Sequence, residues 1–224
     1  MKHFRISKMR FRMKGVYFMD GIIFDVDGTI WDSTAEVAES WNQALRDHSD
    51  LDLEITPEIL SKLFGKTMDE IYEALFPDLP HKEQVRLGDL CYEYENILLE
   101  TKPGRLYNGI IETITTLAKK YKIYIVSNCQ LGYIDVMLKT TGLGSYVEDF
   151  LCYGHTLAKK SVTIKELMER NQLKDVVYIG DTEGDATACF EANIPFIFAA
   201  YGFGEVPDAQ VRIDKPIELL DLIP

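Results

Sequence analysis

The sequence predicts an α/β fold with a doubly wound parallel sheet and an inserted all-helical unit. Short apolar runs alternate with amphipathic helical segments in residues 101–224, a pattern typical of parallel strands connected by helices on both faces of a sheet. Residues 34–100 carry helical periodicity that no strand pattern interrupts. We therefore predict a core domain of residues 16–33 and 101–224, a helical cap domain of residues 34–100 and a basic N-terminal extension of residues 1–15.

The first predicted strand, residues 16–24, ends directly at two aspartates. Asp25 and Asp27 follow the apolar run, and Gly28 and Thr29 complete an Asp-Val-Asp-Gly-Thr motif. A buried strand of such a sheet delivers the residues after it to the carboxyl edge, where ligands bind. Gly28 permits the turn that the chain must make there. We expect both aspartates at the mouth of a site.

Helix start signals divide the predicted cap into separate helices. Ser33 and Glu36 fit a capping box at the start of the first helix. Thr56 followed by Pro57 is typical of an N-cap and the first helical position of a second helix. Two further cap helices are predicted, over residues 68–75 and 82–99.

The rest of the chain alternates between the two element types. Predicted helices cover residues 108–120, 131–140, 160–171, 185–192 and 216–222. Predicted strands cover residues 121–126, 146–153, 176–179 and 195–199.

Composition narrows the class of protein. The net charge is −12, and the first fifteen residues hold six basic and no acidic side chains, so the remainder carries a charge of −18. Such an acidic body argues against nucleic acid as a partner. Four cysteines lack CxxC spacing, which favours reduced thiols and a cytoplasmic location. Since no apolar run reaches transmembrane length, we expect no membrane partner.

Polar side chains also follow three later predicted strands. They are Ser127 and Asn128, the neighbouring lysines Lys159 and Lys160, and Asp181 with Asp185. The carboxyl ends of parallel strands lie on one edge, so these groups should converge with Asp25 and Asp27. Clustered carboxylates without a His/Cys ligand set suit Mg²⁺, which prefers oxygen ligands.

Together, Asp25–Thr29, Ser127-Asn128, Lys160 and Gly180–Asp185 resemble the haloacid dehalogenase (HAD) superfamily, in order and separation. The helical insertion resembles the cap of its phosphoglycolate phosphatase-like branch. The resemblance implies a Rossmann-like core and a Mg²⁺ ion held by Asp25, Asp27 (through its backbone carbonyl) and Asp181. It also implies that Asp185 holds a metal-bound water or the lysine.

The same resemblance implies catalytic roles. Asp25 would be the nucleophile that forms an aspartyl-phosphate, and Asp27 the general acid and base. Phosphate would be held by Ser127, by Lys160 and by the segments Gly28-Thr29 and Ser127-Asn128, with backbone amides of Gly28 and Asn128 taking part. Lys160 is preferred to Lys159 because Ile164 then falls at the usual place in the next helix. Lys66, in the break between two cap helices, could reach substrate when the cap closes.

The resulting hypothesis is a Mg²⁺-dependent phosphomonoester hydrolase acting on a small phosphorylated metabolite, such as phosphoglycolate or a sugar phosphate, as a monomer or dimer. A phosphosugar mutase of the same superfamily would retain the same core residues. A phospho-accepting receiver module shares clustered aspartates, a hydroxyl and a lysine, but carries its acceptor on a middle strand and lacks a helical insertion. A non-catalytic binding protein should have lost a catalytic residue, and none is missing here.

Overall fold

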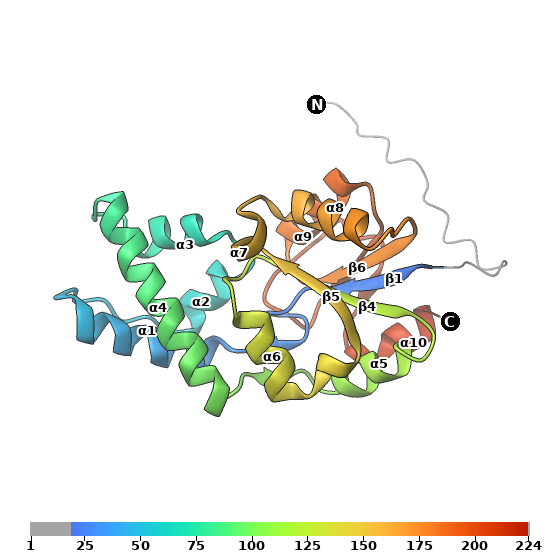
Figure 1. Cartoon of the computed structure of the whole chain (residues 1–224), viewed down its shortest axis with the longest axis horizontal. Helices are drawn as coiled ribbons and strands as arrows, with labels where there is room; N and C mark the ends of the chain where they lie inside the picture. The colour runs from blue at the N-terminus through green and yellow to red at the C-terminus, as the bar shows by residue number, and fades with distance from the viewer. Residues whose placement is uncertain (1–18, 224) are drawn as a thin grey trace.

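The computed structural model describes residues 19–223. It shows a sheet flanked by helices and, beyond the carboxyl ends of the central strands, a group of four helices, α1–α4 (Figure 1). The predicted basic extension of residues 1–15, and the first part of the strand predicted from residue 16, lie outside the described residues. None of the helices in the described part of the chain is long and apolar enough to cross a membrane.

Six parallel strands form the main sheet in the order β5-β4-β1-β6-β7-β8. The strands are β1 (Gly21–Phe24), β4 (Lys122–Ser127), β5 (Val147–Cys152), β6 (Val176–Gly180), β7 (Phe196–Ala199) and β8 (Arg212–Ile213). The chain adds β4 and β5 on one side of β1 and then continues with β6, β7 and β8 on the other. The predicted Rossmann-like, doubly wound fold is therefore confirmed, with its switch point beside β1.

Alternation along β1 explains how the sheet is covered on both faces. Ile22 and Phe24 contribute to one buried apolar cluster, whereas Ile23 contributes to another. Successive side chains of a strand point to opposite faces, so a fully apolar strand needs cover on both sides. All three side chains are completely buried.

The two faces of the sheet carry different helices (Figure 1). Besides the helices of the insertion, the helices with buried residues in the cluster of Ile22 are α5 (Ile110–Leu117), α6 (Tyr133–Thr141) and α10 (Leu219–Leu222). Those in the cluster of Ile23 are α8 (Lys160–Arg170) and α9 (Glu183–Ala192). Three short elements complete the core: η1 (Leu143–Ser145), α7 (Tyr153–Thr156) and η2 (Pro216–Glu218).

The helical insertion contains α1 (Thr34–His48), α2 (Pro57–Leu63), α3 (Met68–Leu75) and α4 (His81–Thr101). The Thr56 side chain accepts a hydrogen bond from the backbone of Ile59, so the predicted start of α2 is confirmed. Helices α1 and α4 pack together through Trp41, whose ring meets that of Tyr92 edge-on at 5.5 Å between centroids. The indole N–H of Trp41 also donates to Glu95 of α4 at 2.6 Å.

A two-stranded antiparallel ribbon joins the helical insertion to the core. Its strands are β2 (Trp31–Asp32) and β3 (Arg105–Leu106), and Trp31 pairs with Leu106. The chain enters the insertion directly after β2 and leaves it directly before β3. Each strand has two residues, so neither shows the alternating pattern by which a strand is predicted.

Several hydrogen bonds hold the insertion against the core, and three of them involve residues near the carboxyl edge of the sheet. The Asn128 side-chain amide donates to the Gly65 carbonyl at 2.7 Å, and Tyr153 donates to Asp69 at 3.0 Å. On the other side, the Asn96 amide donates to the Leu131 carbonyl at 3.1 Å. These contacts hold the insertion, called the cap below, against the carboxyl edge of the sheet.

Candidate active site

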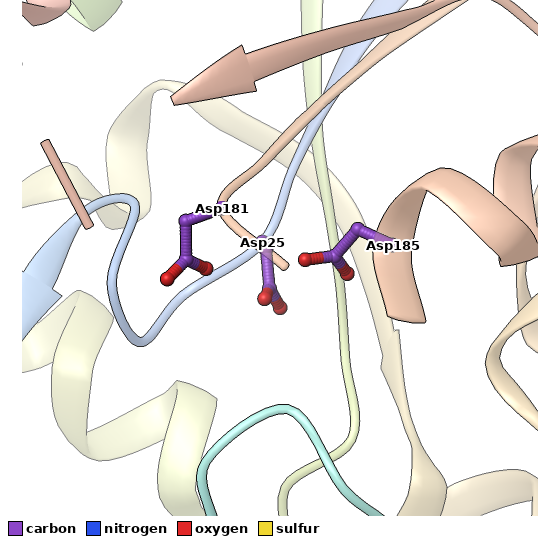
Figure 2. Close-up of side chains that lie close together, drawn as sticks. All are labelled: Asp25, Asp181 and Asp185. Atoms are coloured by element: carbon purple, nitrogen blue, oxygen red, sulfur yellow. The ribbon is translucent and has the colours of Figure 1, made fainter. Parts of the chain in front are cut away.

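Three aspartates from two neighbouring strand ends form one acidic cluster (Figure 2). Asp25 follows β1, Asp181 follows β6 and Asp185 lies in the first turn of α9. One carboxylate oxygen of each lies within 4.8 Å of the others, and all three side chains are buried. The cluster arises from topology, because β1 and β6 are adjacent and Asp25 N–H donates to the Ile179 carbonyl at 2.9 Å.

Two glycines allow the backbone to approach the Asp181 carboxylate. Gly28 has a φ of +77°, and a Cβ there would lie 2.0 Å from Asp181 Oδ2. A Cβ at Gly202 would lie 2.3 Å from the Gly28 carbonyl oxygen. Both positions therefore exclude any side chain. The Phe203 N–H donates a hydrogen bond to Asp181 Oδ2 at 2.7 Å.

Lys160 lies between two of these acids. Its ammonium is 3.1 Å from Asp25 Oδ1 and 2.6 Å from Asp185 Oδ1, and it is almost fully buried. Burial alone would lower the pKa of Lys160, but the carboxylates of Asp185 and Asp25 raise it well above its usual value. The neighbouring Lys159 instead forms an exposed ion pair with Glu191. The choice between the two lysines left by the sequence thus falls on Lys160.

Asp185 has two functions in the local structure. Its Oδ2 accepts hydrogen bonds from the Thr182 N–H and hydroxyl, while the Thr182 hydroxyl oxygen accepts from the Asp185 N–H. This reciprocal arrangement is a capping box that starts α9. Its other oxygen, Oδ1, accepts from Lys160. The helix cap therefore fixes the carboxylate that orients the lysine.

The Asp27 carboxylate is held by three hydrogen-bond donors. Its Oδ1 accepts from the Tyr133 hydroxyl at 2.6 Å, the Ser33 hydroxyl at 2.9 Å and the Trp31 indole N–H at 3.1 Å. Burial raises the pKa of Asp27 to about 6, against the effect of these hydrogen bonds. An acid with a pKa near 6 can exist in both protonation states near neutral pH, as general acid–base catalysis requires.

The contact from Ser33 corrects one expectation. The Ser33 side chain makes no cap hydrogen bond to α1, so the predicted capping box with Glu36 is wrong. Its hydroxyl is completely buried and is directed to Asp27 and Tyr133 instead. Asp32 accepts from the Thr34 N–H at 3.1 Å and serves the start of α1. The half-buried Asp27 carboxylate outcompetes the helix end for the Ser33 hydroxyl, because hydrogen bonds to charged groups are stronger.

The predicted phosphate-binding residues lie close to Asp25, with one difference. Ser127 is the last residue of β4, Asn128 follows it, and both line the same cavity as Asp25. The Thr29 hydroxyl is buried without a hydrogen-bond partner among the described residues. The Gly28 N–H, however, already donates to the Trp31 carbonyl at 2.9 Å within its own turn. Its expected contact with phosphate through that amide is therefore not available in this conformation.

The acidic cluster fits a divalent cation. Asp181 Oδ1 is buried and has no hydrogen-bond partner among the described residues, which leaves an oxygen lone pair unsatisfied. Burial and the charges of Asp185 and Asp25 raise the pKa of Asp181 well above its usual value, and burial raises that of Asp25 to about 7. A bound cation would offset both effects. Asp25 and Asp181, with oxygen donors only, match the preference of Mg²⁺.

A cavity of about 400 Å³, including the part open to solvent, connects this edge of the sheet with the cap. Its core side includes Asp25, Asp27, Ser127, Asn128 and Tyr133. Its cap side includes Trp41, Lys66, Tyr92 and Glu95. Lys66 lines this cavity, and its side chain is exposed to solvent.

Two cavity residues carry no signal in the sequence. Tyr133 reaches Asp27 because α6 begins after Gly132, and Glu95 reaches the cavity from the middle of α4. Neither belongs to a motif, and both follow from how whole helices pack. In contrast, the aspartates and Lys160 are placed by the ends of strands or the start of a helix.

Fold and site define the class of protein. A doubly wound sheet carries a buried acidic and lysine-containing site at its switch point, under a helical cap, which is the arrangement of an α/β enzyme with an enclosed active site. The particular family follows from comparison, because the family model for haloacid dehalogenase-like hydrolases matches residues 22–199, most of the chain. The chain belongs to the haloacid dehalogenase-like hydrolase family.

Similar proteins cover nearly the whole chain. A phosphoglycolate phosphatase of Photobacterium profundum is 26% identical, over 95% of this chain and 97% of its own. One from Aquifex aeolicus is 26% identical, over 90% and 95%. A crystal structure described as a predicted phosphoglycolate phosphatase, from Haemophilus somnus, has a TM-score of 0.81 at 21% identity, covering 94% of this chain and 100% of the other. The chain is a phosphatase-like hydrolase of this family.

Proposed function

We propose that the protein is a Mg²⁺-dependent phosphomonoester hydrolase that acts through an aspartyl-phosphate on a small phosphorylated metabolite. The observation that carries the proposal is the pairing of two distinct aspartates at the end of β1. Asp25 lies 3.1 Å from the Lys160 ammonium within the acidic cluster, whereas the Asp27 carboxylate accepts hydrogen bonds from three other donors. The names of the curated relatives support the same reaction class.

In this proposal, Asp25 attacks the phosphorus atom, and the bond between phosphorus and the alcohol oxygen breaks. Protonated Asp27 gives its proton to the departing oxygen, so that the alcohol leaves neutral. A water molecule then attacks the aspartyl-phosphate after giving a proton to Asp27, and inorganic phosphate and free Asp25 result. Splitting one displacement into two allows the same carboxyl group to act first as acid and then as base.

The remaining residues hold charge and geometry. The Lys160 ammonium would stabilise the negative charge on the transferring phosphoryl group, and Ser127 with the Asn128 backbone would contact its oxygens. Asp25 and Asp181 would hold Mg²⁺, together with the Asp27 backbone carbonyl. When bound, the ion would neutralise phosphate charge and align the ester with Asp25. The three donors to Asp27 would keep its second oxygen, Oδ2, free for the leaving group.

The proposal is tested by measuring phosphate release from a panel of phosphate esters with and without Mg²⁺. We expect turnover that requires Mg²⁺ and is lost when Asp25→Asn replaces the nucleophile with a neutral group of the same shape. Asp78→Asn, at an exposed position of the cap, is the matched control and should retain full activity. Failure to release phosphate from any ester, including p-nitrophenyl phosphate, would contradict the proposal. Interconversion of sugar phosphate isomers without release would indicate a mutase.

A further inference from the structure

The cap contributes a carboxylic acid to the cavity. Glu95 of α4 lines the cavity and is 3% exposed. Both of its oxygens are held, since Oε2 accepts from the Trp41 indole N–H at 2.6 Å and Oε1 from the Gln130 amide at 3.1 Å. These two hydrogen bonds fix the Glu95 side chain. It cannot move aside when a ligand binds unless they break.

Glu95 lies on the side of the cavity where the alcohol part of a substrate would lie. Asp27, Tyr133 and Glu95 line the same cavity, and the Tyr133 hydroxyl donates to Asp27 at 2.6 Å. The ionisable groups that interact with Glu95 from neighbouring positions are Asp27, Tyr133, Tyr92 and Cys91. Because Asp27 would protonate the leaving oxygen, the group attached to that oxygen extends toward Glu95.

The charges of this part of the cavity are unfavourable for a second anion. Among the described residues that line the cavity, Lys66 is the one cation, and its side chain is exposed. Burial raises the pKa of Glu95 to about 8, with a further contribution from the charge of Asp27. A substrate carboxylate beside a neutral Glu95 would have to share the proton of Glu95. Beside an ionised Glu95, the two negative charges would repel each other.

The free hydrogen-bonding capacity of the cavity favours a donor. Asn128 uses its amide N–H to bind the Gly65 carbonyl, which fixes the orientation of the amide. Its Oδ1 is then buried without a hydrogen-bond partner among the described residues. A ligand hydroxyl can donate to this oxygen or exchange hydrogen bonds with Glu95, whereas a carboxylate can only accept.

We propose that the enzyme selects phosphate monoesters whose alcohol part is uncharged and carries a hydroxyl group, and that Glu95 discriminates against esters of hydroxy acids. This inference rests on the proposed phosphatase function and narrows its substrate class. The expected substrate therefore differs from the one in the relatives' names, because phosphoglycolate carries a carboxylate on its alcohol part. Identity of 26% to those relatives leaves room for such a difference.

The test compares two esters of nearly equal size, 2-hydroxyethyl phosphate and phosphoglycolate. The first carries a hydroxymethyl group where the second carries a carboxylate. We expect kcat/KM at pH 8.5 with Mg²⁺ to favour the hydroxyl compound at least tenfold. In Glu95→Gln, this ratio should fall at least fivefold through faster turnover of phosphoglycolate, because the amide can donate to the carboxylate. Glu100→Gln, on the exposed side of the same helix, should keep the wild-type ratio.

Inhibition by inorganic phosphate should be equal in wild type and Glu95→Gln, which shows that the phosphate side of the site is intact. Equal or better turnover of phosphoglycolate by the wild type would overturn the inference, as would a ratio that Glu95→Gln leaves unchanged. Either result, obtained with an active enzyme, leaves the phosphatase proposal standing. If no ester, p-nitrophenyl phosphate included, is hydrolysed, the phosphatase proposal fails and this inference fails with it.

Discussion

Lys160 is the residue on which the charge balance of the site depends. Its single positive charge is buried against Asp25 and Asp185, and Asp181 adds a third carboxylate nearby. Buried charges of one sign cannot remain ionised without compensation. The charge of the lysine therefore lowers the pKa of Asp25, which burial raises, and the ion pairs also maintain the local structure.

Replacing Lys160 with methionine removes this compensation while keeping most of the side-chain volume. We expect Lys160→Met to lower the free energy of unfolding by about 3 kcal/mol, typical for breaking a buried ion pair. The turnover number should fall at least 100-fold, as when an enzyme loses a group that stabilises transition-state charge. Denaturant titration and an ester hydrolysis assay measure the two effects.

Lys159→Met is the matched control, since Lys159 is the adjacent residue and its ion pair with Glu191 is exposed. Exposed pairs contribute about 0–1 kcal/mol, so this variant should retain stability and activity. If both substitutions gave the same small effect, Lys160 would not have the role assigned to it here.

Glu95 makes a separate prediction about pH. Its pKa is raised from 4.5 to about 8 in the folded protein, chiefly by burial, so the folded state binds more protons than the unfolded state between these values. Stability from this group is therefore lost as the pH rises, by about 3 kcal/mol between pH 5.5 and 8. Glu95→Gln should lack this loss, and its stability relative to wild type should increase over that interval. Urea unfolding at both pH values measures the difference.

Asp25 and Asp27 titrate in the same range but are present in both proteins, so comparison of wild type with Glu95→Gln isolates the cap residue. A constant difference between the two proteins from pH 5.5 to pH 8 would show that Glu95 is ionised throughout.

Residues at strand ends were predictable from the sequence, whereas residues brought in by helix packing were not. Asp25 and Asp181 come directly after apolar strand runs, so topology alone places them together. Tyr133 and Glu95 reach the cavity only because of the orientation of α6 and α4. The capping role predicted for Ser33 is wrong because two partners compete for its hydroxyl. The sequence shows the local capping pattern, but it does not show that the folded chain brings the Asp27 carboxylate to the same hydroxyl.

At the scale of elements, the long and periodic segments were predictable and the short ones were not. The helix expected over residues 68–75 matches α3, and the helix expected over 82–99 is α4 with slightly wider bounds. The ribbon of β2 and β3, and strand β8, each contain two residues per strand. Such strands are defined by their neighbours, not by a pattern of their own.

The packing of α3 on α4 depends on one glycine. A Cβ at Gly88 of α4 would lie 1.8 Å from the Tyr72 ring of α3. Gly88→Ala should therefore destabilise the cap by about 1–3 kcal/mol, the range typical of overpacking, although alanine favours a helix. Thermal unfolding measures the change. Gly144→Ala is the control, since its nearest contact of 3.8 Å is ordinary and the same substitution should leave stability near wild type. A stabilised Gly88→Ala would mean that the Tyr72 ring moves freely.

At the scale of the whole molecule, the cap and the core form one enclosed site on a strongly acidic protein. The net charge of −12 repels anionic ligands at long range, so binding of phosphate depends on local cations. Among the described residues, Lys160 supplies one such charge and already faces two acids. Under the proposed function, a phosphate ester dianion would need a further positive charge at the acidic cluster, and Mg²⁺ would then serve substrate binding as well as chemistry.

This dependence predicts that Mg²⁺ stabilises the folded protein even without substrate. In the proposed site, the ion would bind Asp25 and Asp181, which come together only when β1 and β6 are paired, so binding would favour the folded state. At a concentration 100 times its dissociation constant, it should add about 2.7 kcal/mol to the free energy of unfolding. Asp181→Asn should abolish this increase while remaining folded, because its side chain can still accept from Phe203 N–H. Asp78→Asn should retain the increase. Thermal unfolding over a Mg²⁺ titration measures all three proteins, and an equal shift in wild type and Asp181→Asn would place the ion elsewhere.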